Sequence, residues 1–385
     1  MVILREQKAT KEPVSSIYAV FETKGDDGGV DRLIELMDVG GLNFYKTEKK
    51  GIGFGLDGII ESDDVILIKV NSQWDERGGT NTDLIKAIIK AVFNHPDSFK
   101  GEVVVADNGQ AQYGSTRKGG SFDYEKNNAY DTSQSIRKVC ESYSKKGKKV
   151  SCYLWDPITE KIVSEYSDSD FNDGFVVSTR VNPTTGVIPS YPKFTTEYNS
   201  RVSFKHGVWN EEKKGYDRAR LKILNVPVLK CHFIYGVTGA VKHYMGVNSD
   251  KITSNLGYST HKSVGRGGMG TLMAATRVPD LNILDAIFVN ARPGSGPMTT
   301  YASAYETNII AASTDPIALD YWGSKNILMP AMPRGYGLDS TLIDPDNSNE
   351  DSFGVWLRKA ADELNASDYP FTFDPARINV KVAER

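Results

Sequence analysis

Lysine and histidine side chains are concentrated in one short apolar stretch of this sequence. Residues 226–246 read VPVLKCHFIYGVTGAVKHYMG and carry Lys230, His232, Lys242 and His243. Burial of a lone ammonium costs several kcal/mol unless the charge is paired or neutralised. The stretch therefore requires either an acidic partner or an anionic ligand, and we favour the ligand.

The range 237–245 is expected to be helical. Thr238 and Lys242 would then share one face of the helix at positions i and i+4, while His243 would point about a quarter-turn away. This arrangement would direct Lys242 at the bound anion.

Polar side chains also follow the predicted strands elsewhere. In open parallel sheets, ligands bind beyond the carboxyl ends of the strands. The polar residues at such ends are Lys69, Asn71, Asp107, Asn108, Lys230, His232, Asn290 and Asp315. Behind Asn290 lies the turn ARPGSGP, where Gly294 and Gly296 could let backbone amides approach a ligand.

Several of these residues also suit a purely structural role. Lys69 could extend its ammonium past the sheet edge. Asp107 and Asp315 could be turn or helix caps, and capping is the commoner role for Asp315 because Pro316 follows it. His232 could be a hydrogen-bonded core histidine, and His261, in a glycine-rich loop, could be solvated.

The elements that must position these residues alternate between strand and helix. Expected strands are 16–22, 65–70, 102–107, 149–155, 224–233, 282–290 and 307–314, and expected helices are 30–39, 81–95, 131–147 and 350–365. This order predicts βαβ units and mostly parallel sheets, so the fold class is α/β.

We expect two α/β lobes, at residues 1–160 and 218–385, separated by an insertion at 161–217. The chain of 385 residues is long enough for more than one core. The insertion is rich in Tyr, Asn, Thr, Gly and Pro, with strand patterns at 175–181 and 201–209. It is expected to be irregular or antiparallel, and it could act as a lid.

Composition excludes several classes of partner. The net charge of −3 offers no electrostatic footprint for nucleic acid. No apolar run approaches the roughly 18 residues of a membrane span. The three cysteines are far apart and include no CxxC, so neither a disulfide framework nor a Cys-ligated cluster is expected. The start lacks the apolar region of a secretory signal, which favours the cytoplasm; the alternative is export with the signal peptide removed.

The sequence resembles the DUF362 family, a large group of uncharacterised proteins, some with an added ferredoxin-like domain. The stretches that carry the resemblance are VILIKVN (65–71), VVVADNG (103–109), NVPVLKCH (225–232), GVTGAVKHYMG (236–246), PDLNILDAI (279–287) and NIIAASTDPIALD (308–320), in family order over roughly residues 15–330. The resemblance implies that Lys69, Asn71, Lys230, His232, Lys242 and Asp315 are the family's recurrent polar residues. It implies no reaction, because none is established for the family.

Two residues depart from the family pattern. Val70 stands where Pro is usual, and His243 stands where Asn usually follows the lysine. The extra imidazole makes a metal or proton-transfer role conceivable for this member. The ferredoxin-like cysteines are absent, so no iron–sulfur cluster is expected in this chain.

These residues suit an enzyme that acts on a small anionic substrate, a carboxylate or a phosphate. Lys69, Lys230 and Lys242 would hold the anion, and Asn71, Asn108 and Asn290 would bind and orient it. His232, with Lys242 and Lys69, forms the candidate catalytic set, because an imidazole titrates near neutral pH. In the alternative chemistry, His232, His243, His261 and Asp315 would ligate a divalent metal.

Two other functions stay open. The chain could be a non-catalytic soluble protein that binds an anion under its insertion, or the partner of a separate iron–sulfur redox protein. Lysines and histidines at strand ends fit chemistry slightly better than simple capture, for which backbone amides and arginine often suffice.

Overall fold

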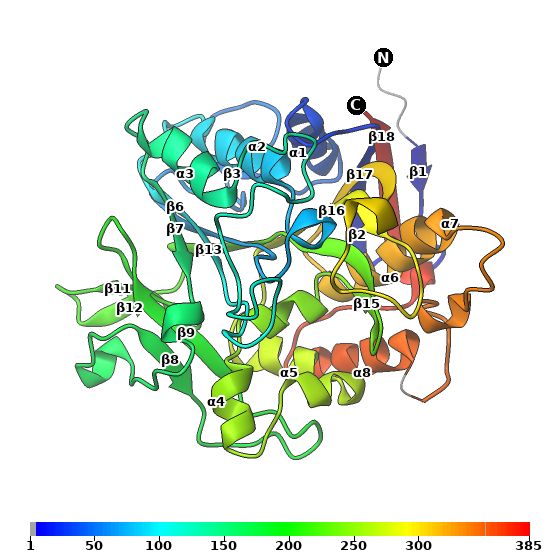
Figure 1. The fold of residues 1–385 in the computed structure, drawn as a ribbon. Helices are drawn as coiled ribbons and strands as arrows, with labels where there is room; N and C mark the ends of the chain where they lie inside the picture. Colours follow the sequence, from blue (N-terminus) through cyan, green and yellow to red (C-terminus); the bar gives the residue numbers. More distant parts are fainter. Residues whose placement is uncertain (1–4, 351) are drawn as a thin grey trace.

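The main sheet draws strands from both ends of the chain. A computed structural model describes residues 5–350 and 352–385. Within them, eleven strands form one sheet (Figure 1). Nine of them follow the order β1-β18-β2-β17-β16-β13-β5-β6-β7; β14 pairs with β16, and β15 pairs with β14. The outer strands are β1 (Arg5–Gln7), β2 (Ser15–Phe21) and β18 (Ile378–Glu384).

A parallel block forms the half of this sheet that ends in β7. It contains β5 (Val65–Lys69), β6 (Glu102–Asp107), β7 (Val150–Leu154) and β13 (Leu221–Asn225). β16 (Leu281–Asn290) runs parallel to β13 and to β14 (Val228–His232), whereas β17 (Tyr305–Ser313) is antiparallel to both β16 and β2. The expected α/β class with a mostly parallel sheet is confirmed.

Helices cover both faces of the sheet. On one face lie α1 (Gly29–Val39), α2 (Thr82–Phe93) and α3 (Ile136–Ser144); on the other lie α5 (Gly268–Ala275), α6 (Pro316–Gly323) and α8 (Phe353–Asn365) (Figure 1). Along β5, Ile66 and Ile68 pack with α1–α3, while Val65 and Leu67 pack into the opposite core. Burial on both faces explains why this strand is apolar throughout.

The predicted insertion forms a separate antiparallel sheet. Its strands are β8 (Gly174–Val177), β9 (Ser190–Thr195), β10 (Arg201–Ser203), β11 (Gly207–Asn210) and β12 (Gly215–Asp217). Phe194, Val202 and Phe204 pack into the core that contains α5 and α8. The expected antiparallel character is confirmed. The boundaries 1–160, 161–217 and 218–385 stay a prediction, and the main sheet contains strands from the first and last of these ranges.

The range 237–245 is not an α-helix. Gly236–Thr238 forms strand β15, which pairs antiparallel with β14 and places Val237 beside Cys231. A 3₁₀ turn, Lys242–Gly246, follows it. The helical expectation is wrong because tertiary pairing with β14 overrides the local apolar periodicity.

Three other boundaries differ from the expectation. The single strand expected at 224–233 is divided into β13 and β14, and Pro227 between them has no backbone N–H for a ladder. The helix expected at 131–147 begins only at Ile136, where the Ser135 side chain caps it. The helix expected at 350–365 begins at Phe353; Asp351 lies outside the described residues.

Within the described ranges, no helix combines the length and the apolar character that a membrane crossing requires.

Gly270 lets α5 approach α8 at backbone distance. A Cβ at this position would collide with the backbone of Ala360 in α8. We expect Gly270→Ala to lower the free energy of unfolding by roughly 1–3 kcal/mol, measured by urea denaturation, because two packed backbones must separate. Gly215→Ala is the control, because the atom nearest to a Cβ at this position, the carbonyl oxygen of Lys213, would be 3.7 Å away. An equal loss of stability in both variants would contradict the packing argument.

Candidate functional site: a lysine-lined cavity at the strand ends

Four parallel strands end at one edge of the main sheet. β5 ends at Lys69, β6 at Asp107, β13 at Asn225 and β14 at His232. Lys69 lies in register with Asn225 on one side and Ala106 on the other. The polar residues that terminate these strands are therefore neighbours in space, as the strand-end rule predicts.

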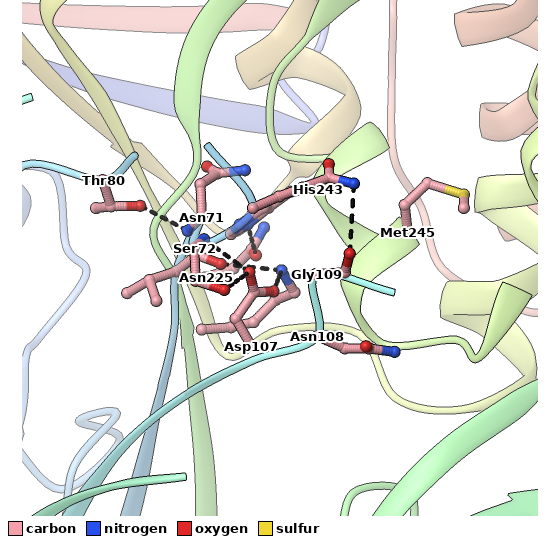
Figure 2. Close-up of polar contacts among 12 residues, drawn as sticks. Asn71, Ser72, Thr80, Asp107, Asn108, Gly109, Asn225, His243 and Met245 are labelled. Carbon is pink, nitrogen blue, oxygen red and sulfur yellow. Dashed lines mark hydrogen bonds and ion pairs between the residues drawn. The ribbon is translucent and has the colours of Figure 1, made fainter. Parts of the chain in front are cut away.

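Lys69 forms a buried ion pair with Asp107. Its Nζ lies 2.8 Å from Asp107 Oδ1, and both side chains are almost fully buried. The second carboxylate oxygen accepts hydrogen bonds from the backbone N–H and the hydroxyl of Ser72, each at 2.8 Å (Figure 2). A Cβ at Gly246 would collide with Asp107 Oδ1, so only glycine fits above this pair. Asp107, for which a capping role was one alternative, neutralises Lys69.

Asp320 of α6 holds the segment that carries Lys242 and His243. It is buried, and it accepts hydrogen bonds from the backbone N–H groups of Ala240 at 2.5 Å and Val241 at 2.9 Å. Burial raises the pKa of this carboxyl to about 7. Backbone donors thus take the place of a cationic partner for Asp320.

His243 presents one ring nitrogen without a partner. Its Nδ1 lies 2.7 Å from Asn225 Oδ1 (Figure 2). The amide of Asn225 is oriented by its Nδ2, which donates to the carbonyl of Ala240 and to Asn282 Oδ1. Nδ1 of His243 must therefore donate, which leaves Nε2 unprotonated. This Nε2 is buried and has no hydrogen-bond partner among the described residues. Burial and then the charge of Lys69 lower the pKa of His243, and the nearby backbone of Val70 opposes this shift.

His232 has the opposite tautomer. Its Nδ1 accepts from the backbone N–H groups of Ile234 at 3.2 Å and Tyr235 at 3.3 Å. The proton of the neutral ring therefore lies on Nε2, which can donate a hydrogen bond but has no free lone pair for a metal. Burial, followed by the nearby charge of Lys242, strongly lowers the pKa of His232.

Lys230 and Lys242 are buried cations that lack a carboxylate partner. In the part of the chain that the structure describes, no carboxylate oxygen lies within 4.0 Å of either ammonium. Lys230 donates to the carbonyl of Gly78 at 2.6 Å, and Lys242 Nζ lies 5.6 Å from the centre of the Tyr235 ring. Burial lowers the pKa of both side chains to about 7, and the charge of Lys242 contributes to the shift of Lys230.

The four expected metal ligands do not come together. Asp315 caps α6 by accepting from the N–H groups of Ile317 and Ala318, and it also accepts from Ser15 and Thr372. His261 lies near His232, with ring centres 5.9 Å apart, and burial lowers its pKa to about 4. Over residues 5–350 and 352–385, no group of three or more His, Cys, Asp and Glu side chains is placed to hold a metal ion.

A cavity of about 420 Å³ opens at this edge. Eight of the predicted site residues line it: Lys69, Asn71, Asn108, Lys230, His232, Lys242, His243 and His261. Of the residues described in the insertion 161–217, none lines it, so the expected lid does not form a wall of this cavity.

Two of the lining amides already have structural partners. Asn71 Oδ1 accepts from the backbone N–H of Val228 at 2.8 Å. Asn108 Nδ2 donates to the carbonyl of Asn248 and to Thr159, each at 3.2 Å. Asn108 also accepts at Oδ1 from the backbone N–H of Gln110, so both ends of its amide are occupied, whereas the Nδ2 group of Asn71 keeps its two N–H donors for a ligand.

The glycine-rich turn touches the cavity only through Pro297. Asn290 binds Ser295 and the N–H of Arg292 within the turn itself. A Cβ at Gly296 would collide with the carbonyl of Cys231, and Gly294 lies near Leu342. None of the three residues Asn290, Gly294 and Gly296 lines the cavity; the turn packs against β14 through Gly296.

Sequence reasoning missed residues that hold the site together, above all Asn225 and Asp320. Asn225 ends a buried parallel strand, so the rule that selected Lys69 could have found it. Asp320 follows Asp315 by five positions in the stretch TDPIALD, but its partners lie about 80 residues away in the chain. No local signal reveals such a contact.

The fold and the site define an α/β protein with a cationic cavity at its parallel strand ends. Residues 217–325 match the model of the DUF362 family, a domain of unknown function. The resemblance inferred from the sequence is thereby confirmed for this range, which contains Lys230, His232, Lys242 and His243; Lys69 and Asp107 lie outside it. Comparison with curated proteins and with solved structures found no match.

The ion pair predicts opposite effects for two lysine substitutions. Lys69→Met should lower the free energy of unfolding by roughly 3–5 kcal/mol, because it leaves Asp107 buried and unpaired. Lys242→Met should be stabilising at pH 6, because it removes a buried cation that has no carboxylate partner. Urea denaturation at pH 6 checks both, with the exposed Lys262→Met as control. If Lys242→Met destabilises the fold as much as Lys69→Met, Lys242 is a structural residue.

The effect of Lys242→Met should also depend on pH. The pKa of Lys242 is about 7 in the folded protein against an ordinary 10.5, so the unfolded chain binds more protons between these values and wild-type stability rises there with pH. The advantage of Lys242→Met should be a few kcal/mol below pH 7 and vanish toward pH 10.5, measured as the difference between paired denaturation curves. A constant difference from pH 6 to 10 would contradict the assigned shift.

Proposed function

We propose that the protein is an enzyme that acts on a small anionic substrate, a carboxylate or a phosphate, bound in this cavity. One observation carries the proposal: Lys230 and Lys242 line the cavity without a carboxylate partner, while neighbouring Lys69 has one. An anion would supply the missing charge. The two ammonium groups bind it, and Lys69 stays paired with Asp107.

The histidines divide the acid–base roles between them. His243 offers an unprotonated Nε2 and is the candidate base, since its Nδ1 is occupied by Asn225. His232 offers an Nε2–H and is the candidate hydrogen-bond donor to the substrate or to a developing negative charge. The sequence placed His232 in the candidate catalytic set; in this proposal His232 is the hydrogen-bond donor and His243 is the base.

Anion binding should weaken as pH rises. Lysines with a pKa of about 7 are protonated at pH 6. At pH 9 they are neutral, so binding of an anion must be coupled to the uptake of protons from solution, which lowers the affinity. We expect the affinities for acetate and sulfate, whose own charges stay constant over this range, to fall by roughly tenfold or more between pH 6 and pH 9. Isothermal titration calorimetry measures them.

Lys230→Met and Lys242→Met should each abolish this binding at pH 6, whereas Lys262→Met should leave it unchanged. Equal affinity at pH 6 and pH 9, or binding that survives in both cavity variants, would contradict an anion site built on these lysines.

Catalysis should depend on the unprotonated nitrogen of His243. His243→Asn removes it and keeps a hydrogen-bonding side chain. We expect this variant to bind acetate as the wild type does, within about threefold, and to slow turnover by roughly a hundredfold or more. Proton NMR in D₂O over a panel of carboxylates and phosphate monoesters detects conversion or deuterium incorporation. If every compound that binds the wild type is recovered unchanged, the protein is a binding protein instead.

A further inference from the structure

The cavity is much larger than a bare anion requires. Its volume of about 420 Å³ lies within the range of about 300–1,000 Å³ that is typical of pockets for drug-sized ligands. An acetate or phosphate ion bound by the two lysines would leave most of this space to the rest of the ligand. The side chains that line the remainder therefore indicate what that part is.

The outer part of the cavity is apolar and rich in aromatic groups. Tyr113, Phe233 and Ile234 line it and are 51%, 61% and 50% exposed, whereas Lys230 and Lys242 are 1% and 6% exposed. The cations thus lie at the buried end and the apolar groups at the open rim. The Phe233 ring stacks on His232, with centroids 5.4 Å apart and planes at 8°, which gives the rim a flat face.

Two polar atoms on the cavity wall have no partner. Trp74 Nε1 and Thr238 Oγ1 are buried and make no hydrogen bond with any residue that the structure describes. Both residues line the cavity, and Thr238 lies in register beside Lys230. Buried donors of this kind normally have a partner, and acceptor oxygens on a ligand at this wall would supply one.

We infer that the substrate is an aromatic carboxylate: its carboxylate binds Lys230 and Lys242, and its ring packs against Phe233 and Trp74. The inference rests on the proposed function, because it uses the same cationic end of the cavity. The flat Phe233–His232 pair and the indole favour a planar ring over a flexible chain, since aromatic rings stack at such faces. Thr238 Oγ1 donates to the carboxylate beside Lys230.

The test compares acetate, phenylacetate and its neutral analogue phenylacetamide by calorimetry at pH 6. We expect phenylacetate to bind roughly tenfold or more tightly than acetate, because the ring buries additional apolar area. We expect phenylacetamide to lose most of this affinity. Phe233→Ala should weaken phenylacetate by about fivefold or more and leave acetate unchanged. Phe171→Ala is the matched control, because Phe171 is also exposed but does not line the cavity.

The outcomes separate the inference from the proposal beneath it. If acetate and phenylacetate bind equally, or if Phe233→Ala has no effect, the anion site stands and the aromatic substrate is wrong. If phenylacetamide binds as tightly as phenylacetate, or if no anion binds at all, the anion site itself is wrong.

Discussion

Charge compensation at the carboxyl ends of the parallel strands is the constraint on which this structure depends. Lys69, Lys230 and Lys242 are all buried at one sheet edge, where each ammonium loses its hydration. Asp107 compensates Lys69 at 2.8 Å and is itself held by Ser72. Among the described residues, neither Lys230 nor Lys242 has a carboxylate partner of this kind. The result is a folded state that keeps an uncompensated positive field at one point.

The surrounding scaffold keeps carboxylates out of direct contact with Lys230 and Lys242: Asp107 and Asp250 also line the cavity, but neither forms an ion pair with these two lysines. Asp320 is the buried acid that positions the Lys242 segment, but its oxygens are occupied by two backbone N–H groups. Asn225, a neutral amide, orients His243 where an aspartate would have added charge. Each element that approaches the lysines thus fixes the geometry without neutralising the ammonium groups.

Much of the site could be predicted from sequence because parallel strands place their ends together. The runs VILI (65–68) and VVVA (103–106) are apolar throughout, so the polar residue that follows each run had to lie at the edge of the sheet, and Lys69 and Asp107 do. The segment 237–245 could not be predicted in the same way. Its local pattern is helical, but pairing of Val237 with Cys231 and capture by Asp320 decide its form. The direction of the Asn290 side chain could not be predicted either. Asn290 lies in register beside Lys230, but its side chain hydrogen-bonds to Ser295 in the following turn.

His232 and His243, two of the three histidines that line the cavity, acquire different chemistry from the partners of their Nδ1 atoms. Nδ1 of His232 accepts from backbone N–H groups, so its Nε2 carries the proton and donates. Nδ1 of His243 donates to the side-chain Oδ1 of Asn225, so its Nε2 is unprotonated and accepts. Both rings stay neutral, because burial lowers both pKa values. Neutrality matters here, since two imidazolium groups would add to the repulsion that Lys230 and Lys242 already experience. At neutral pH the site therefore holds one neutral hydrogen-bond donor and one neutral acceptor, and in the proposed reaction a proton taken up by His243 would make it an imidazolium beside the bound anion.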